Sequence, residues 1–162
     1  MASILKTDKL EGVTSSSHIQ MPTGHIVQVV HNVLNTTTSI TSDTTSFVAS
    51  GFSISVTPKR VGNVILVQYN TSIFHKQVTS AAEVKLYLDG SQASGTASYW
   101  GGYVSADNNA TDYSPRLGTY KYTAVDTNSH TFEPYFRSYN SNNVYFIHGD
   151  GSAIISATEI QT

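Results

Sequence analysis

Apolar and polar residues alternate along much of this chain with the period of two that is typical of β-strands. The clearest case is GFSISVTP at residues 51–58, where Phe52, Ile54 and Val56 alternate with serine and threonine. The segment EVKLYLDG at residues 83–90 alternates in the same way, and its Asp-Gly pair predicts a hairpin turn. No segment keeps helical spacing over more than two turns. The pattern therefore indicates strands rather than helices.

Other segments extend the strand pattern along the chain. Residues 64–67 are continuously apolar, which predicts a central strand covered on both faces. The Thr/Ser tract at residues 36–47 favours a solvent-facing edge strand with a turn at Ser42-Asp43. Residues 91–116 are rich in Gly, Ser and Asn, which predicts a long surface loop with one short strand at residues 98–104. About eight to ten short strands at this spacing predict an all-β fold, an antiparallel β-sandwich of the jelly-roll type.

The alternation also predicts which side chains form the core. We expect burial of Phe52, Ile54, Val64, Leu66, Leu86, Leu88 and Ile155.

Composition narrows the class of protein. The 162 residues fit one domain, and the chain contains no cysteine, so it has no disulfide and no thiol chemistry. Its net charge of −2 argues against a nucleic-acid partner, and no apolar run is long enough for membrane insertion. Only 12% of residues are charged, about half the usual fraction in soluble domains. Such a composition suits an assembly that hides part of its surface from water.

Catalytic and metal-binding patterns are weak. The HGDG segment at residues 148–151 has the glycines of a hairpin tip, and no Gly-x-Ser-x-Gly motif is present. The six histidines show no metal-ligand spacing, and the acidic residues near position 110 lack a calcium-loop pattern. We therefore expect a protein that is not an enzyme and has no cofactor or metal.

One stretch has the composition of a recognition surface. Tyr99, Trp100, Tyr103 and Tyr113 lie among small and polar residues at 98–115, as rigid aromatics do in binding loops. They are candidates for a receptor or glycan surface. The alternative is that Trp100 and Tyr103 pack under the loop or against a neighbouring subunit.

The beginning of the chain differs from the rest. Ile4, Leu5 and Leu10 occur in a short segment that ends in a serine-rich hinge at residues 14–17, while the alternating pattern starts only at His25. We therefore divide the chain into an N-terminal anchoring arm and hinge, residues 1–23, and a β-sandwich head, residues 24–162. The three apolar side chains are candidates for anchoring the protein on a neighbouring sheet edge or in a groove.

Five pieces of the sequence together resemble a domain of tailed-bacteriophage structural proteins, especially marine ones. In order along the chain, these are residues 24–30, 51–58, 63–67, 86–90 and 157–160. The opening SILKTDKLEGVTSS is also similar to the start of such proteins. The chain departs from the family pattern with LDG in place of RDG and TEI in place of MEI, and residues 98–115 do not align.

The resemblance implies a jelly-roll head, similar to tumour-necrosis-factor-like trimers, without enzymatic activity. It implies a homotrimer on the virion surface, made in the host cytoplasm, whose partners are itself and the major capsid protein or a tail protein. Two placements compete: a decoration or cement protein of the capsid, and a short tail-fibre head that binds a host receptor.

The sequence favours decoration over the fibre. An arm of about 20 residues reaches at most about 70 Å when fully extended, and no shaft repeat lengthens it. A third reading, a carbohydrate-binding module that recognises a host-surface glycan, is supported by the aromatic loop but not by the arm.

Overall fold

The computed structural model describes residues 23–35, 40–76, 82–93, 99–100, 111–139, 141, 143–147 and 151–162. These residues form strands, turns and bends, and they include no helix that could span a membrane. Within this part of the chain the strands are β1 (Ile26–Asn35), β2 (Ile40–Ser42), β3 (Val48–Ala49), β4 (Ile54–Val56), β5 (Val64–Lys76), β6 (Ala82–Leu88), β7 (Ser91–Gln92), β8 (Tyr99–Trp100), β9 (Thr111–Thr123), β10 (His130–Ser138), β11 (Val144–Ile147) and β12 (Ser152–Ile160).

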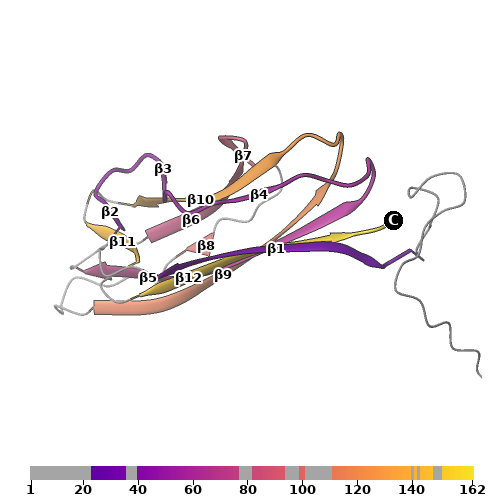
Figure 1. The fold of residues 1–162 in the computed structure, drawn as a ribbon. Helices are drawn as coiled ribbons and strands as arrows, with labels where there is room; N and C mark the ends of the chain where they lie inside the picture. The colour runs from indigo at the N-terminus through magenta and orange to yellow at the C-terminus, as the bar shows by residue number, and fades with distance from the viewer. Residues whose placement is uncertain are drawn as a thin grey trace, which may run out of the picture.

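The strands pack as two antiparallel sheets, which confirms the expected all-β sandwich and is consistent with a jelly roll. Sheet A has the order β1-β12-β5-β11-β2. β12 and β11 pair with successive parts of one edge of β5, and β9 pairs with its other edge. Sheet B has the order β3-β10-β6-β7, with β4 also on β10 and β8 on β6. Figure 1 shows the layers from the side, with β10, β6 and β4 above β1, β12, β5 and β9.

The core lies between the two sheets and is rich in phenylalanine. Phe132 and Phe136 of β10 are fully buried, and Phe136 lies against Phe146 of β11 at 5.6 Å between ring centroids. Four residues of the expected core are confirmed as buried: Phe52, Ile54, Leu86 and Ile155. Leu88 is partly buried and packs against the same cluster.

The predicted phase of the central strand β5 is wrong. Ile65 and Val67 are the buried residues, while Val64 and Leu66, expected in the core, are only half-buried. The strand is central in the plane of sheet A, because β12 and β9 flank it over residues 64–71. Among the described residues, however, no second layer covers its outer face, so that alternate side chains point away from the core.

Three further local predictions are confirmed. Residues 52–57 alternate between buried apolar and more exposed polar side chains. Asp89 and Gly90 both have positive φ, 50° and 77°, and join β6 to β7 as the expected hairpin turn. β2 is an edge strand paired to β11, although within the described part of the Thr/Ser tract it spans only Ile40–Ser42, and Ser42 is buried.

The region predicted as a long loop, residues 91–116, contains more strand than expected. β7 and β8 both pair with β6, and residues 111–116 form the first half of β9 opposite residues 71–76 of β5. The local composition misled the prediction because cross-strand pairing with β5 overrides the low strand preference of Asp, Ser and Pro.

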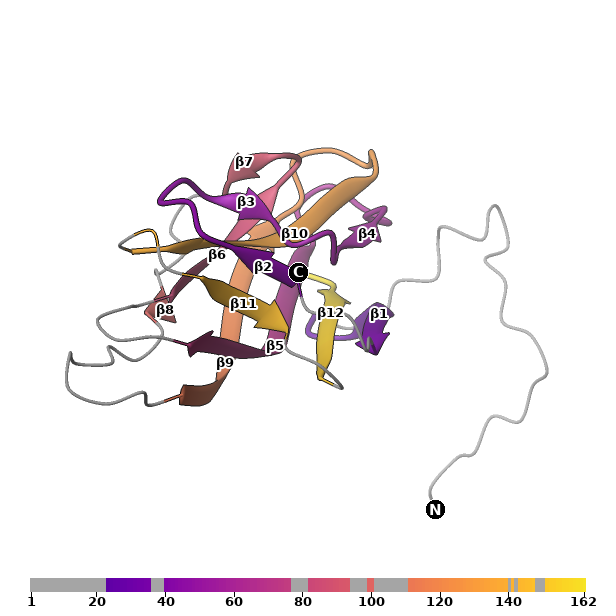
Figure 2. The ribbon, with the colours of Figure 1, turned by 90° about the vertical axis from the view of Figure 1, so that its left-hand side faces the viewer.

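The two open sides of the sandwich are closed differently. On one side β11 and β2 rise from sheet A toward β3, as Figure 2 shows. On the other side, side-chain amides of β1 reach main-chain carbonyls beside β4: Gln28 Nε2 donates to Thr57 O at 2.8 Å and Asn32 Nδ2 to Ser53 O at 2.9 Å. These bonds occupy acceptors on the outer edge of β4 and so hold the sheets together.

The phase of β5 makes a testable prediction. Ile65→Ala should lower the free energy of unfolding by about 2–5 kcal/mol, since the fully buried side chain leaves a cavity. Leu66→Ala should cost below about 1.5 kcal/mol, because its side chain is only half-buried. Urea unfolding at concentrations that keep the chain monomeric measures both. Equal losses would contradict the observed phase.

Candidate functional site

The aromatic residues predicted to form one recognition surface lie in different sheets. Tyr99 and Trp100 form β8 in sheet B, opposite Val84 and Glu83 of β6. Tyr113 belongs to β9 in sheet A. Tyr103 and the candidate anchoring residues lie outside the described residues, the latter being Ile4, Leu5 and Leu10. The four aromatics therefore stay a predicted recognition surface, with the three described ones placed on two strands of different sheets.

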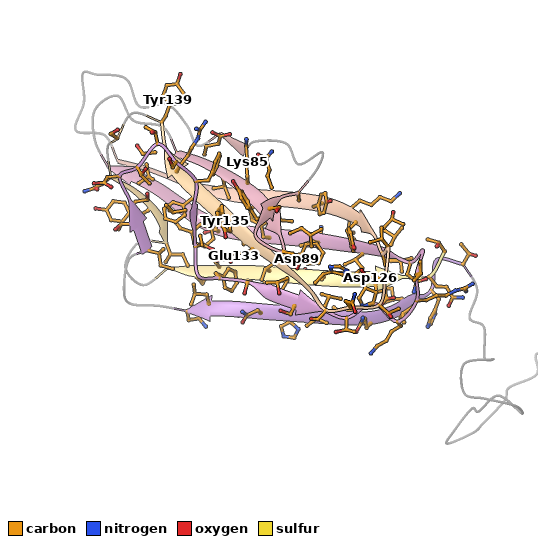
Figure 3. All side chains as sticks on the ribbon, turned by 90° about the horizontal axis from the view of Figure 1, so that it is seen from above. Lys85, Asp89, Asp126, Glu133, Tyr135 and Tyr139 are labelled. Carbon is orange, nitrogen blue, oxygen red and sulfur yellow. The ribbon has the colours of Figure 1, made fainter. Side chains whose placement is uncertain are left out.

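A different aromatic cluster covers the outer face of sheet B. The rings of Tyr87 and Tyr135 stack at 3.8 Å between centroids, with an interplanar angle of 12°. Phe47, from the segment between β2 and β3, approaches Tyr87 at 6.2 Å. Burial and then the neighbouring Tyr135 raise the pKa of Tyr87 above its ordinary value. Figure 3 looks onto this face and shows Tyr135 with Lys85 and Glu133.

Charged groups complete this cluster and pair with one another. Arg137 binds the buried carboxylate of Glu83 through Nε at 2.7 Å and through its terminal nitrogen at 2.6 Å. Arg137 also donates to Thr45 O at 3.1 Å and lies over the Phe47 ring at 4.7 Å. Lys85 Nζ lies over the same ring at 4.8 Å and 3.6 Å from Glu83. These contacts hold the segment after β2 against sheet B. In this structural role the guanidinium of Arg137 is bound to groups of its own chain.

The outer face of sheet A has a different character. Its outward side chains form four rows across β1, β12, β5 and β9, which we call the four-row face. The rows are Val33, Ile154, Asn70 and Leu117; His31, Ser156, Gln68 and Thr119; Val29, Thr158, Leu66 and Lys121; and Ile26, Ile160, Val64 and Thr123. Leu117 is 67% exposed, Val29 57% and Ile154 46%. The face contains no carboxylate and one lysine.

A shallow depression of about 230 Å³ lies in this face. Leu117 and Ile154 stand at its sides, and Asn70, Gln68, Thr119 and Ser156 supply amide and hydroxyl groups. The lining therefore combines two aliphatic side chains with four hydrogen-bonding ones.

His130 is the centre of a polar cluster at one end of sheet B. Its Nδ1 lies 2.8 Å from Asp89 Oδ2, and its Nε2 lies 3.2 Å from Asp126 Oδ1 and 3.1 Å from the Tyr122 hydroxyl. Asp89 also accepts from the Thr131 N–H at 2.8 Å. Figure 3 shows both aspartates toward the same end of the molecule. The cluster joins the β6–β7 turn to the turn after β9.

The environments of the two aspartates favour their ionised forms. Burial acts to raise the pKa of Asp89, but bonds from His130 and the Thr131 N–H outweigh it, so this pKa lies below the ordinary 3.8. The pKa of Asp126 is also lowered, first by the Asn128 N–H. The carboxylates lie on separate nitrogens of one imidazole and do not converge on a point. Accordingly, the described residues contain no group that could hold a metal ion.

A buried carboxylate connects distant parts of the chain. Glu159 of β12 is fully buried and accepts from Gln28 Nε2 at 2.5 Å, Asn63 Nδ2 at 2.7 Å and the Lys59 N–H at 2.9 Å. These three N–H donors satisfy the carboxylate, and no cationic side chain among the described residues forms an ion pair with it. Glu159 thus ties β12 to β1 and to both ends of the turn between β4 and β5.

Sequence reasoning missed both the four-row face and the role of Glu159. The face had a readable signal, since residues 26–35 contain four valines and no Lys, Arg, Asp or Glu. The role of Glu159 had no signal in the sequence, because its donors lie 96 to 131 residues away. A single glutamate in a strand is ordinarily expected to be exposed.

We expect Glu159→Ala to reduce the free energy of unfolding by about 3–5 kcal/mol, because it leaves buried donors without an acceptor. Glu133→Ala is the matched control. Glu133 is half-buried and accepts a bond from the Gly51 N–H at 2.8 Å, so its loss should cost about 1 kcal/mol. Chemical denaturation compares the two variants. Similar losses would show that Glu159 is not a hub of the fold.

The cluster around His130 predicts a specific acid response. A carboxylate whose pKa is lowered by folding adds stability above its ordinary value of 3.8 and loses it as the pH falls below that value. Asp89→Asn should therefore lower the melting temperature near neutral pH and flatten its decline between about pH 5 and pH 2. Thermal melts across this range measure both effects. Parallel curves for the two proteins would contradict the prediction.

Comparisons with known proteins add little to this description. No protein-family model and no curated protein matches the chain. Among solved structures, a chain described as "Structure of infectious bursal disease virus Gx strain" is similar at 10% identity and a TM-score of 0.30. The match covers 99% of this chain and 44% of the viral chain, so this chain spans less than half of that chain's length.

Proposed function

We propose that this chain is a non-enzymatic structural protein of the virion surface of a tailed bacteriophage. It acts as a homotrimer that decorates or cements the capsid, with its N-terminal arm bound to the major capsid protein. The proposal takes its biological setting from the sequence resemblance described above. The β-sandwich is compatible with that resemblance and does not by itself select a function.

One observation supports the resemblance most directly. Its five pieces are scattered along the sequence, yet Glu159 in the last piece is bonded to Gln28 in the first and to Asn63 in the third. The same carboxylate accepts from the N–H of Lys59, the residue that follows the second piece. Parts of three of the pieces therefore meet at one buried carboxylate, which supports treating them as elements of one fold.

The tail-fibre head remains a second candidate function because of a specific surface. Phe47, Tyr87 and Tyr135 lie on the outer face of sheet B, and β8, which contains Trp100, pairs with the neighbouring strand β6. Aromatic rings on a rigid sheet suit stacking on a glycan. Their partners within the chain nevertheless occupy much of this face, so we favour decoration.

The arm provides the test. Deleting residues 1–17 should leave a folded, soluble head with nearly unchanged thermal midpoint, because β1, the first described strand, begins only at Ile26. The deletion should abolish binding to particles, since burial of Ile4, Leu5 and Leu10 stabilises attachment by roughly 1.5–3 kcal/mol per side chain. Three arms in a trimer reinforce one another through effective concentration.

Co-sedimentation of full-length and truncated protein with particles stripped of this component measures the difference. Far-UV circular dichroism and thermal melting of the truncated protein provide the folding control. Equal binding by the two forms would place attachment on the head and contradict the anchoring role.

A further inference from the structure

We propose that the four-row face of sheet A is the surface through which copies of this chain associate. The inference rests on the proposed function to the extent that a homotrimer is expected there, and it assigns the contact to β1, β12, β5 and β9. The partner is a second copy of the chain, and the four-row face contacts the protein surface of that copy directly.

Exposure of aliphatic side chains is the first argument. Leu117, Ile154 and Val33 lie in one row, at 67%, 46% and 45% exposure, and Val29 and Leu66 lie two rows away. Four strands about 4.8 Å apart, each over about seven residues, give a flat footprint of roughly 400 Å². Protruding side chains raise the accessible area above this value, toward the ~800 Å² per partner of a standard interface.

The polar groups of the face argue for a copy of itself as the partner. The row between the apolar rows consists of His31, Ser156, Gln68 and Thr119. Amide and hydroxyl groups both donate and accept hydrogen bonds, so such a row can bond to polar groups on the surface of another copy. The face has no carboxylate, and Lys121 is its only lysine. It therefore neither repels its copy strongly nor presents the basic patch that would attract an acidic partner.

The opposite face of the sandwich lacks these properties. The outer face of sheet B displays Glu83, Lys85, Glu133 and Arg137, and the segment containing Phe47 already packs on it. Its ion pairs and aromatic stacking are satisfied within one chain. Of the two outer faces, sheet A is the one whose apolar side chains gain from being covered.

Substitutions at two positions of the face test the proposal. Full-length protein should elute with three times the 17.5 kDa mass of the chain in light scattering at micromolar concentration. Ile154→Lys and Leu117→Lys should shift it to the mass of one chain, because a desolvated ammonium would face apolar neighbours. Val125→Lys is the control. Val125 is 70% exposed but lies in the turn after β9, outside the face.

A second measurement avoids introducing a charged side chain into the proposed interface. The chain contains no cysteine, so Ile154→Cys and Val125→Cys each introduce a single thiol. On raising the protein concentration, alkylation of the Ile154→Cys thiol by a maleimide should slow several-fold. Alkylation of the Val125→Cys thiol should keep its rate, because this position stays in water.

The outcomes separate the inference from the proposed function. An oligomer that survives both lysine substitutions, with equal alkylation of the two thiols, overturns the assignment of the face and leaves the virion role standing. A protein that has the mass of one chain at all concentrations overturns the assignment and the homotrimer together. A protected face in a dimer supports the assignment and contradicts the threefold stoichiometry.

Discussion

The buried carboxylate of Glu159 is the constraint on which the arrangement of the two sheets depends. A fully buried carboxylate is tolerated only when its oxygens are satisfied, and here three N–H donors from β1 and from the turn between β4 and β5 converge on it. Because Gln28 also donates to Thr57 O, the same contact connects the edge of sheet A to the edge of sheet B. Displacing any of these segments would leave polar groups unpaired in the core.

This closure leaves the outward side chains of β1 on the outer face of sheet A, where no second layer formed by the described residues covers them. With β1 held at the edge by its inward amides, its outward side chains, including Val29 and Val33, line up with those of β12, β5 and β9. Sheet B instead uses its outer face to bind its own segment through Phe47 and Arg137. The outer face of sheet B thus stabilises the subunit, and the outer face of sheet A is the one that we propose contacts a second copy.

Features that depend on neighbouring residues could be predicted from the sequence, and features that depend on distant residues could not. The alternation of residues 52–57 was readable because one face of β4 meets the core and the other meets water. The phase of residues 64–67 is not readable because a continuous apolar run contains no alternation, so a half-buried Leu66 looks the same in the sequence as a buried Ile65. The Glu159 contacts could not be predicted, since they join residues about a hundred positions apart. The aromatic recognition surface stays a prediction, because Tyr103 lies outside the described residues, while β8 and β9 belong to different sheets.

The central claim, that the chain is a structural component of the virion surface, is tested most directly by its copy number in purified particles. Quantitative mass spectrometry relative to the major capsid protein measures this number without altering the chain. The account predicts a fixed, high ratio, with three copies or a multiple of three at each capsid position that it decorates. A ratio corresponding to a few copies per particle would assign the chain to the tail, and its absence from particles would contradict the account.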